Sequence, residues 1–161
     1  MSSNAGLDLI TDDDRAKPCK VELHRKSLIG PFAYHWVFYF RWEGGYDMYC
    51  EGVDDDKVLR PHCERGMPEM GLFPLVEDLG TRQDLSPKRV NTLALRNRCN
   101  GKVYEITRMN CQVWAKQLAG DLGIDILTPI NVVGSIPGSE VIDELHSIVK
   151  YGSGSSSLSK K

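Results

Sequence analysis

The sequence predicts an α+β domain in which a small antiparallel sheet packs on helices. Residues 35–40 form an apolar, aromatic and β-branched run with the length and composition of a strand. Gly44 and Gly45 accept the positive φ of a tight hairpin turn, so residues 46–51 are predicted to form the returning strand. Large apolar side chains recur every four positions across residues 111–123, which is the pattern of an amphipathic helix.

The other elements of the N-terminal half follow from local signals. Residues 20–24 alternate between polar and apolar side chains, as a half-buried strand does, and Gly30-Pro31 marks a turn after them. Prolines and glycines interrupt residues 52–86, so no long element is predicted there. This stretch is instead expected to line a substrate cleft with short strands or loops.

Three further elements are predicted in the C-terminal half. A helix begins at Ser86-Pro87, because serine caps helices well and proline suits the first helical position. It extends to about Arg98. Residues 102–106 form a short strand, and a last amphipathic helix is expected at residues 139–150.

The composition is that of one ordinary globular domain. The chain of 161 residues suits a single domain at residues 19–151, between a flexible segment at 1–18 and a disordered Gly/Ser-rich tail at 152–161. The formal net charge of −2 argues against a nucleic-acid partner, and no apolar run reaches the roughly 20 residues of a membrane span. No signal peptide is recognised, so we expect a cytoplasmic protein that is not integral to a membrane. The oligomeric state is left open.

The five cysteines are irregularly spaced and include no Cys-x-x-Cys pair. An odd number of cysteines in a cytoplasmic protein favours free thiols over disulfides. The spacing also lacks the pattern of a closed zinc site, so we expect neither a metal nor a cofactor. The run Asp54-Asp55-Asp56 has cation-binding side chains but is more typical of a solvated turn.

Cys111 lies where the helix at 111–123 begins, with Asn110 as its N-cap and Gly123 as its C-cap. Free backbone N–H groups and the helix dipole favour negative charge at this position, which lowers the pKa of a thiol. The thiolate is the nucleophilic form of cysteine, and the same N–H groups are suited to stabilise an oxyanion. Cys111 is therefore the candidate nucleophile. The contrary interpretation is that Cys111 is a small apolar core residue, as most free cysteines are.

A nucleophilic cysteine needs a base, and the chain has four histidines. His35 opens the strand at 35–40, which would hold it rigidly, so we predict that His35 is the base. Asp47, Tyr49 and Glu51 share one face of the returning strand and are the candidates for orienting His35. The hairpin register brings Glu51 closer to His35 than Asp47.

The remaining histidines are assigned no chemistry. His24 alternates with apolar neighbours and is expected on the solvent side, and His146 is expected on the surface of the last helix. His62 is adjacent to Cys63. Neighbouring strand residues point to opposite faces, so these two are not expected to act together.

The segment from Val103 to Asn110-Cys111, followed by a helix, resembles the Asn-Cys nucleophile segment of lecithin:retinol acyltransferase-like proteins. His35-Trp36 at the start of a strand is similar to the His-Trp motif of the same proteins. The histidine precedes the cysteine, as it does in circularly permuted papain-like domains, including the PPPDE peptidases and relatives of the NlpC-type amidases. The resemblance covers roughly residues 20–123. It implies a permuted papain-like fold.

The chain departs from this family in three respects. After the cysteine, those proteins often continue with Glu-His-Phe or Asn-His-Phe, whereas this chain has Gln112-Val113-Trp114 and keeps only the aromatic residue. The acyltransferases carry a second histidine on the returning strand, near the position of Tyr49 here, so the orienting role passes to Glu51, Tyr49 or Asp47. The C-terminal membrane helix of several lipid-modifying members is absent, which argues against a membrane-lipid substrate.

Together these observations predict an enzyme, a thiol hydrolase or acyltransferase. Cys111 would attack an amide, ester or isopeptide carbonyl and form a thioester, with His35 as general base and Glu51 as the third residue. The substrate would be a small molecule, a peptide or a protein. The expected substrate-binding residues are Tyr49, Asn110 and Trp114. The alternative is a non-catalytic binding or interaction module with the same fold, in which Cys111 is buried in the core.

Overall fold

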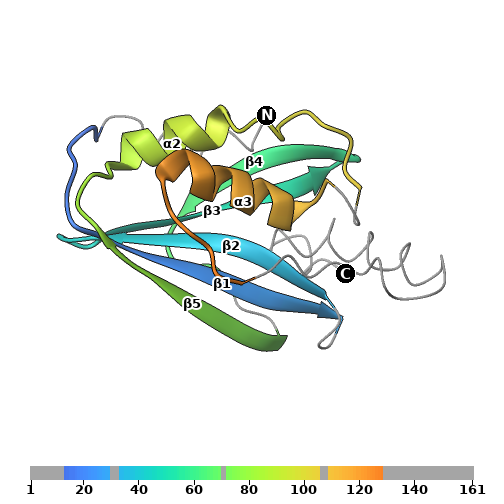
Figure 1. The fold of residues 1–161 in the computed structure, drawn as a ribbon, viewed down its shortest axis with the longest axis horizontal. Coiled ribbons are helices and arrows are strands. Elements are labelled where there is room, and N and C mark those ends of the chain that lie inside the picture. The colour runs from blue at the N-terminus through green and yellow to red at the C-terminus, as the bar shows by residue number, and fades with distance from the viewer. Residues whose placement is uncertain (1–12, 30–32, 70–71, 106–108, 129–161) are drawn as a thin grey trace.

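The framework of the protein is a five-stranded antiparallel sheet with the strand order β4-β3-β2-β1-β5 (Figure 1). The computed structural model describes residues 13–29, 33–69, 72–105 and 109–128. The two helices in these residues pack on one face of the sheet, so the fold is α+β, as predicted. The elements are β1 (Cys19–Ile29), β2 (Ala33–Trp42), β3 (Tyr46–Asp55), β4 (Val58–Arg65), β5 (Leu72–Arg82), α2 (Pro87–Leu95) and α3 (Cys111–Leu122).

The strands β1, β2 and β3 confirm the three strands predicted from residues 20–51. The turn between β2 and β3 is longer than the two glycines, because Trp42 pairs with Tyr46 and leaves three residues in the loop. Gly44 and Gly45 have φ values of 97° and 92°, which glycine adopts without strain.

The N-cap of α2 and the C-cap of α3 agree with the prediction, but α2 ends at Leu95 and not near Arg98. The Ser86 hydroxyl accepts a hydrogen bond from the backbone N–H of Arg89 at 3.0 Å, and Pro87 occupies the first turn of α2. The helix α3 ends at Gly123, whose φ of 72° gives the left-handed C-cap.

The expectation that residues 52–86 contain no long element is wrong, because this stretch holds β4 and β5. These two strands form the edges of the sheet. An edge strand tolerates proline, since one side of its backbone has no ladder hydrogen bond to lose. Pro61 lies within β4 and Pro74 within β5. Pro61 and Pro74 are therefore compatible with long strands, because β4 and β5 are at the edges of the sheet.

Residues 102–105, the described part of the short strand predicted at 102–106, do not form a strand. Among the described residues of this segment, Val103 makes an isolated bridge with Val58, and Glu105 makes one with Met109. The Asp54-Asp55-Asp56 run ends β3 and enters the β3–β4 turn, which Asp56 and Lys57 form, and an Asp54 carboxylate oxygen accepts from the backbone N–H of Lys57 at 2.7 Å. The Gly30-Pro31 turn, the helix at 139–150 and the tail at 152–161 lie outside the described residues.

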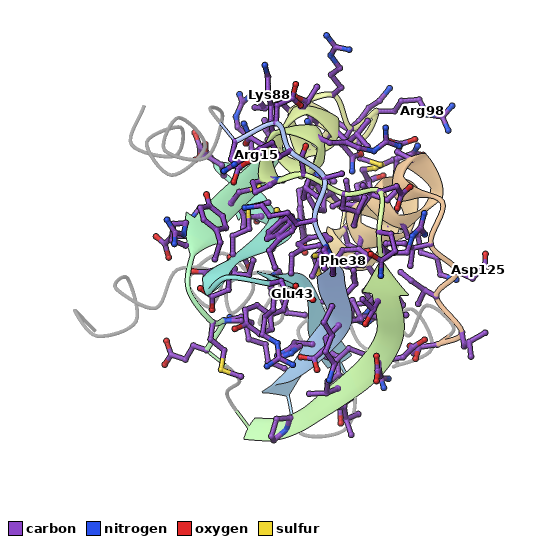
Figure 2. The ribbon with its side chains drawn as sticks, turned by 90° about the vertical axis from the view of Figure 1, so that its left-hand side faces the viewer. Arg15, Phe38, Glu43, Lys88, Arg98 and Asp125 are labelled. Atoms are coloured by element: carbon purple, nitrogen blue, oxygen red, sulfur yellow. The ribbon has the colours of Figure 1, made fainter. Side chains whose placement is uncertain are left out.

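The hydrophobic core lies between the sheet and the helices. Every second side chain of β2 enters it, and Figure 2 shows Phe38 inside the molecule while Lys88 and Arg98 project outward from the helical side. The helix α3 lies very close to the sheet at Gly52. A Cβ on Gly52 would lie only 2.4 Å from Cγ of Trp114, so this contact requires glycine.

The opposite face of the central strands is also buried, which overturns the expected exposure of His24. The His24 side chain is fully enclosed, beside the ring of Tyr39, and its Nε2 lies 2.9 Å from a carboxylate oxygen of Glu22. None of the described helices is long and apolar enough to cross a membrane.

Candidate functional site

The candidate site lies where the sheet divides between β2 and β3. The ladder that joins these strands ends at the pair Phe38–Cys50. Beyond that pair, β2 continues against β1, with His35 opposite Lys26, and β3 continues against β4, with Glu51 opposite His62. The two strands diverge there, and the N-terminal end of α3 lies beside the divergence (Figure 1).

The first residues of α3 supply the partners that β2 lacks from β3. The Gln112 side-chain amide donates to the carbonyl of Tyr34 at 2.9 Å. The backbone N–H of Trp36 donates to the sulfur of Cys111. Hydrogen-bonding groups exposed by the divergence are thus bonded to the helix start, and the same contacts fix Cys111 next to His35.

Cys111 is ionised more readily than an ordinary thiol despite its burial. Burial opposes ionisation, but the positive charge of His35, a hydrogen bond from His35 and the N–H of Trp36 together hold the pKa of Cys111 below its usual range. Two other buried thiols, Cys19 and Cys50, behave differently. Burial raises the pKa of Cys19 to about 12, and burial together with Cys63 raises that of Cys50. Ionisation is therefore favoured at one of these thiols, the one that faces a histidine.

His35 connects Cys111 to Glu51. Its Nε2 lies 2.5 Å from Oε1 of Glu51, and both side chains are only 1% exposed. Burial lowers the pKa of His35, but Cys111 and then Glu51 outweigh it and raise that pKa to about 9. Nδ1 makes no hydrogen bond of ordinary geometry to the described residues, although the thiol of Cys111 interacts with this ring strongly enough to shift both pKa values. We take Nδ1 as the atom that faces the thiol, because Nε2 is already bonded to Glu51.

Glu51 is the only one of the three predicted orienting candidates that contacts His35 among the described residues. The β2–β3 register places Glu51 diagonally opposite His35, across the divergence and on the same face of the sheet as His35. Burial raises its pKa, but hydrogen bonds from His35 and His62 lower it to about 2, so Glu51 carries a negative charge. Asp47 accepts instead from the hydroxyl of Tyr39 at 2.6 Å.

Two residues that the sequence analysis did not select also belong to this site. The Nδ1 of His62 lies 2.9 Å from the second carboxylate oxygen of Glu51. The hydroxyl of Tyr104, which is 3% exposed, interacts with both the backbone N–H and the thiol of Cys111. His62 was missed because β4 was not predicted. The position of Tyr104 in the segment before Cys111 was the available signal for that residue.

The three predicted substrate-binding residues have other contacts in the structure. Asn110 is the N-cap of α3, and its side-chain oxygen accepts from the backbone N–H groups of Gln112 at 3.0 Å and Val113 at 3.1 Å. Trp114 is fully buried and donates from Nε1 to Asn100. The Tyr49 hydroxyl donates to Glu64 at 2.5 Å. These contacts give all three residues structural roles, and their contact with a substrate stays a prediction.

No group of three or more His, Cys, Asp or Glu side chains among the described residues is arranged to hold a metal ion. An open hollow of about 490 Å³ lies at the β2–β3 hairpin, lined in part by Arg41, Trp42 and Tyr46. His35 is at the other end of β2, so this hollow is not the candidate site. Comparison of the chain with family models, curated proteins and solved structures gives no match.

Proposed function

We propose that the protein is a cysteine-dependent hydrolase or acyltransferase that attacks an amide, ester or isopeptide carbonyl. The observation that carries the proposal is the buried arrangement of three side chains, in which the thiol of Cys111 interacts with His35 and Nε2 of His35 lies 2.5 Å from Glu51. A nucleophile, a base and a group that orients the base are the three parts that covalent acyl transfer requires. The order of these residues along the chain supports the permuted papain-like arrangement implied by the family resemblance.

In the proposed reaction, the Cys111 thiolate attacks the carbonyl carbon, and His35 holds the proton that it has taken from the thiol. Glu51 keeps the imidazole in place and stabilises its positive charge. His35 then gives the proton to the leaving amine or alcohol, which leaves a thioester on Cys111. Water or an amine attacks this thioester with His35 again as the base, and the free thiol returns.

The N-cap residue Asn110 lowers the number of backbone N–H groups at the start of α3 that can donate to an oxyanion. Asn110 already accepts from the N–H groups of Gln112 and Val113. The N–H of Cys111 itself and the hydroxyl of Tyr104 interact with each other and lie together beside the sulfur, so both are donors close to the attacked carbonyl. We therefore assign the oxyanion to these two groups.

The alternative, a non-catalytic module with Cys111 in its core, is favoured by one observation, the 3% exposure of Cys111. It does not explain why this thiol is ionised more readily than Cys19 or Cys50. An inert apolar filler would share the raised pKa of those two residues.

The two functions are separated by alkylation of the full-length protein near neutral pH, followed by intact mass spectrometry and peptide mapping. We expect one fast label, on Cys111, that is lost in Cys111→Ser and slowed at least tenfold in His35→Ala, since the thiol then loses the charge that ionises it. His24→Gln is the matched control, because His24 is equally buried and also pairs with a glutamate. Labelling of Cys111→Ser as fast as wild type, or an unchanged rate in His35→Ala, would overturn the proposal.

A further inference from the structure

We propose that His62 is a positioning residue whose own protonation sets the reactivity of the Cys111–His35 pair through Glu51. This inference rests on the proposed function and adds to it a fourth group. The four side chains form one series in space, from Cys111 to His35, Glu51 and His62.

Glu51 bridges two histidines, one on each carboxylate oxygen. Oε1 lies 2.5 Å from Nε2 of His35, and Oε2 lies 2.9 Å from Nδ1 of His62. His62 is directly opposite Glu51 in the β3–β4 ladder, so the two strands hold this contact in place. One carboxylate therefore serves both imidazoles, and a charge on one of them alters what the other receives.

Within this series, His62 is the member with access to solvent. Its side chain is 22% exposed, whereas Glu51 and His35 are each 1% exposed. Protons from solvent therefore reach the series most directly at His62. The buried Cys111–His35 pair therefore responds to pH through His62, which is joined to it by the carboxylate of Glu51.

Charged and titratable groups face His62 from three strands. Glu64 of β4 lies 3.8 Å from its Nε2, and the Tyr49 ring of β3 is 5.8 Å away. Burial lowers the pKa of His62. Glu51 and Glu64 raise that pKa, and the charge of His35 lowers it, so that the net shift is upward. Lys26 of β1 adds a positive charge that acts on Glu51.

The sign of the coupling follows from the orientation of the pair. In the reactive form, Cys111 is negative and His35 is positive, and His35 is the end nearer to Glu51 and His62. A positive charge on His62 therefore destabilises this form, because it lies closer to the like charge than to the thiolate. Protonation of His62 should shift Cys111 toward the neutral thiol, and a neutral side chain at position 62 should not.

Two substitutions imitate the two states of His62 in the full-length protein. His62→Gln keeps a hydrogen-bond donor for Glu51 and is never charged, and His62→Arg is always charged. The measurement is the rate of Cys111 alkylation by iodoacetamide from about pH 5 to about pH 9, with peptide mapping. His24→Gln is the matched control, since it removes a histidine from another His–Glu pair on the same sheet face. Urea unfolding shows whether each variant is folded.

One added charge next to a titrating pair shifts it by roughly one pKa unit, which gives about tenfold effects. We expect His62→Gln to keep its alkylation rate to lower pH and to exceed wild type about tenfold at the acid end. We expect His62→Arg to be about tenfold slower than wild type toward the alkaline end of the range, where His62 of the wild type is neutral, and His24→Gln to follow wild type.

The inference is overturned if the pH profile of Cys111 alkylation in His62→Gln coincides with that of wild type. It is also overturned if the alkylation rate of His62→Gln is lower than that of wild type by the same factor at every pH, as a purely structural role of His62 would give. Where His62→Arg does not fold, the shape of the His62→Gln profile decides. A wild-type protein in which Cys111 is not labelled at all would overturn the proposed function as well. Normal labelling with unchanged profiles overturns this inference alone.

Discussion

Replacing Glu51 by glutamine should remove a contribution to folding stability that requires the ionised carboxylate and that the wild type loses at acid pH. Burial raises the pKa of the Glu51 carboxyl, but His35 and His62 outweigh it and bring the pKa to about 2, compared with 4.5 for an ordinary glutamate. This difference corresponds to about 3 kcal/mol of folding free energy. Because the folded-state pKa is depressed, the contribution is present above about pH 4.5 and is lost as the pH falls through about 2.

The substitution Glu51→Gln acts in both pH ranges. Near pH 7 it removes one of the two negative partners of the His35 imidazolium and leaves the Cys111 thiolate as the other, and breaking a buried ion pair typically costs about 3–5 kcal/mol. Below about pH 4.5, the wild type loses the contribution of Glu51 while the variant has none to lose. The two free energies of unfolding should therefore converge as the pH falls. Urea unfolding followed by tryptophan fluorescence measures this directly, since Trp36, Trp42 and Trp114 are all buried.

Glu22→Gln is the matched control for this experiment. Glu22 lies 2.9 Å from the buried His24, much as Glu51 lies 2.5 Å from the buried His35, and the pKa of Glu22 is also lowered, but the Glu22 side chain is 14% exposed. Water screens that pair, so both the loss near pH 7 and the convergence in acid should be smaller. If wild type and Glu51→Gln lose stability in parallel through the acid range, then Glu51 is not the ionised partner of His35 and the reasoning is wrong.

Two further substitutions test how α3 is held against the sheet. Gly52→Ala should destabilise the protein by about 2 kcal/mol or more in urea unfolding, because its Cβ would lie 2.4 Å from Trp114, whereas Gly120→Ala, which meets open space on α3, should stabilise by up to about 1 kcal/mol. Asn110→Ala should cost about 1 kcal/mol in the same measurement, because it removes the acceptor of two helix N–H groups. An unchanged stability in either Gly52→Ala or Asn110→Ala would show that the corresponding contact does not hold α3.

The parts of the fold that could be predicted are those specified by local pattern. The hairpin depends on adjacent glycines and an aromatic run, and α3 depends on a four-residue apolar repeat between two caps. The strands β4 and β5 could not be predicted, because proline signals a break wherever the tertiary position of a strand is unknown. Pro61 is acceptable only because β4 turned out to be an edge.

The same distinction applies to the candidate site. His35 and Glu51 lie on one hairpin, so their proximity follows from a register that the sequence indicates. His62 reaches Glu51 across a strand pair that the sequence did not indicate, and Tyr104 reaches Cys111 from a segment without regular secondary structure. The burial of His24 likewise is not indicated by the local alternation of residues 20–24.

The divergence of β2 and β3 explains why one short stretch of β3 serves both packing and chemistry. Glu51 and Gly52 are neighbours, so they present to opposite faces of the strand. On one face, the absence of a side chain at Gly52 admits the ring of Trp114. Trp114 is one helical turn after Cys111, and its depth therefore sets how far the start of α3 enters the gap. On the other face, Glu51 holds His35 from across the same gap. A larger residue at Gly52 should thus lift Cys111 away from Trp36 and His35, so that Gly52→Ala slows Cys111 alkylation as well as lowering stability. Gly120→Ala should do neither.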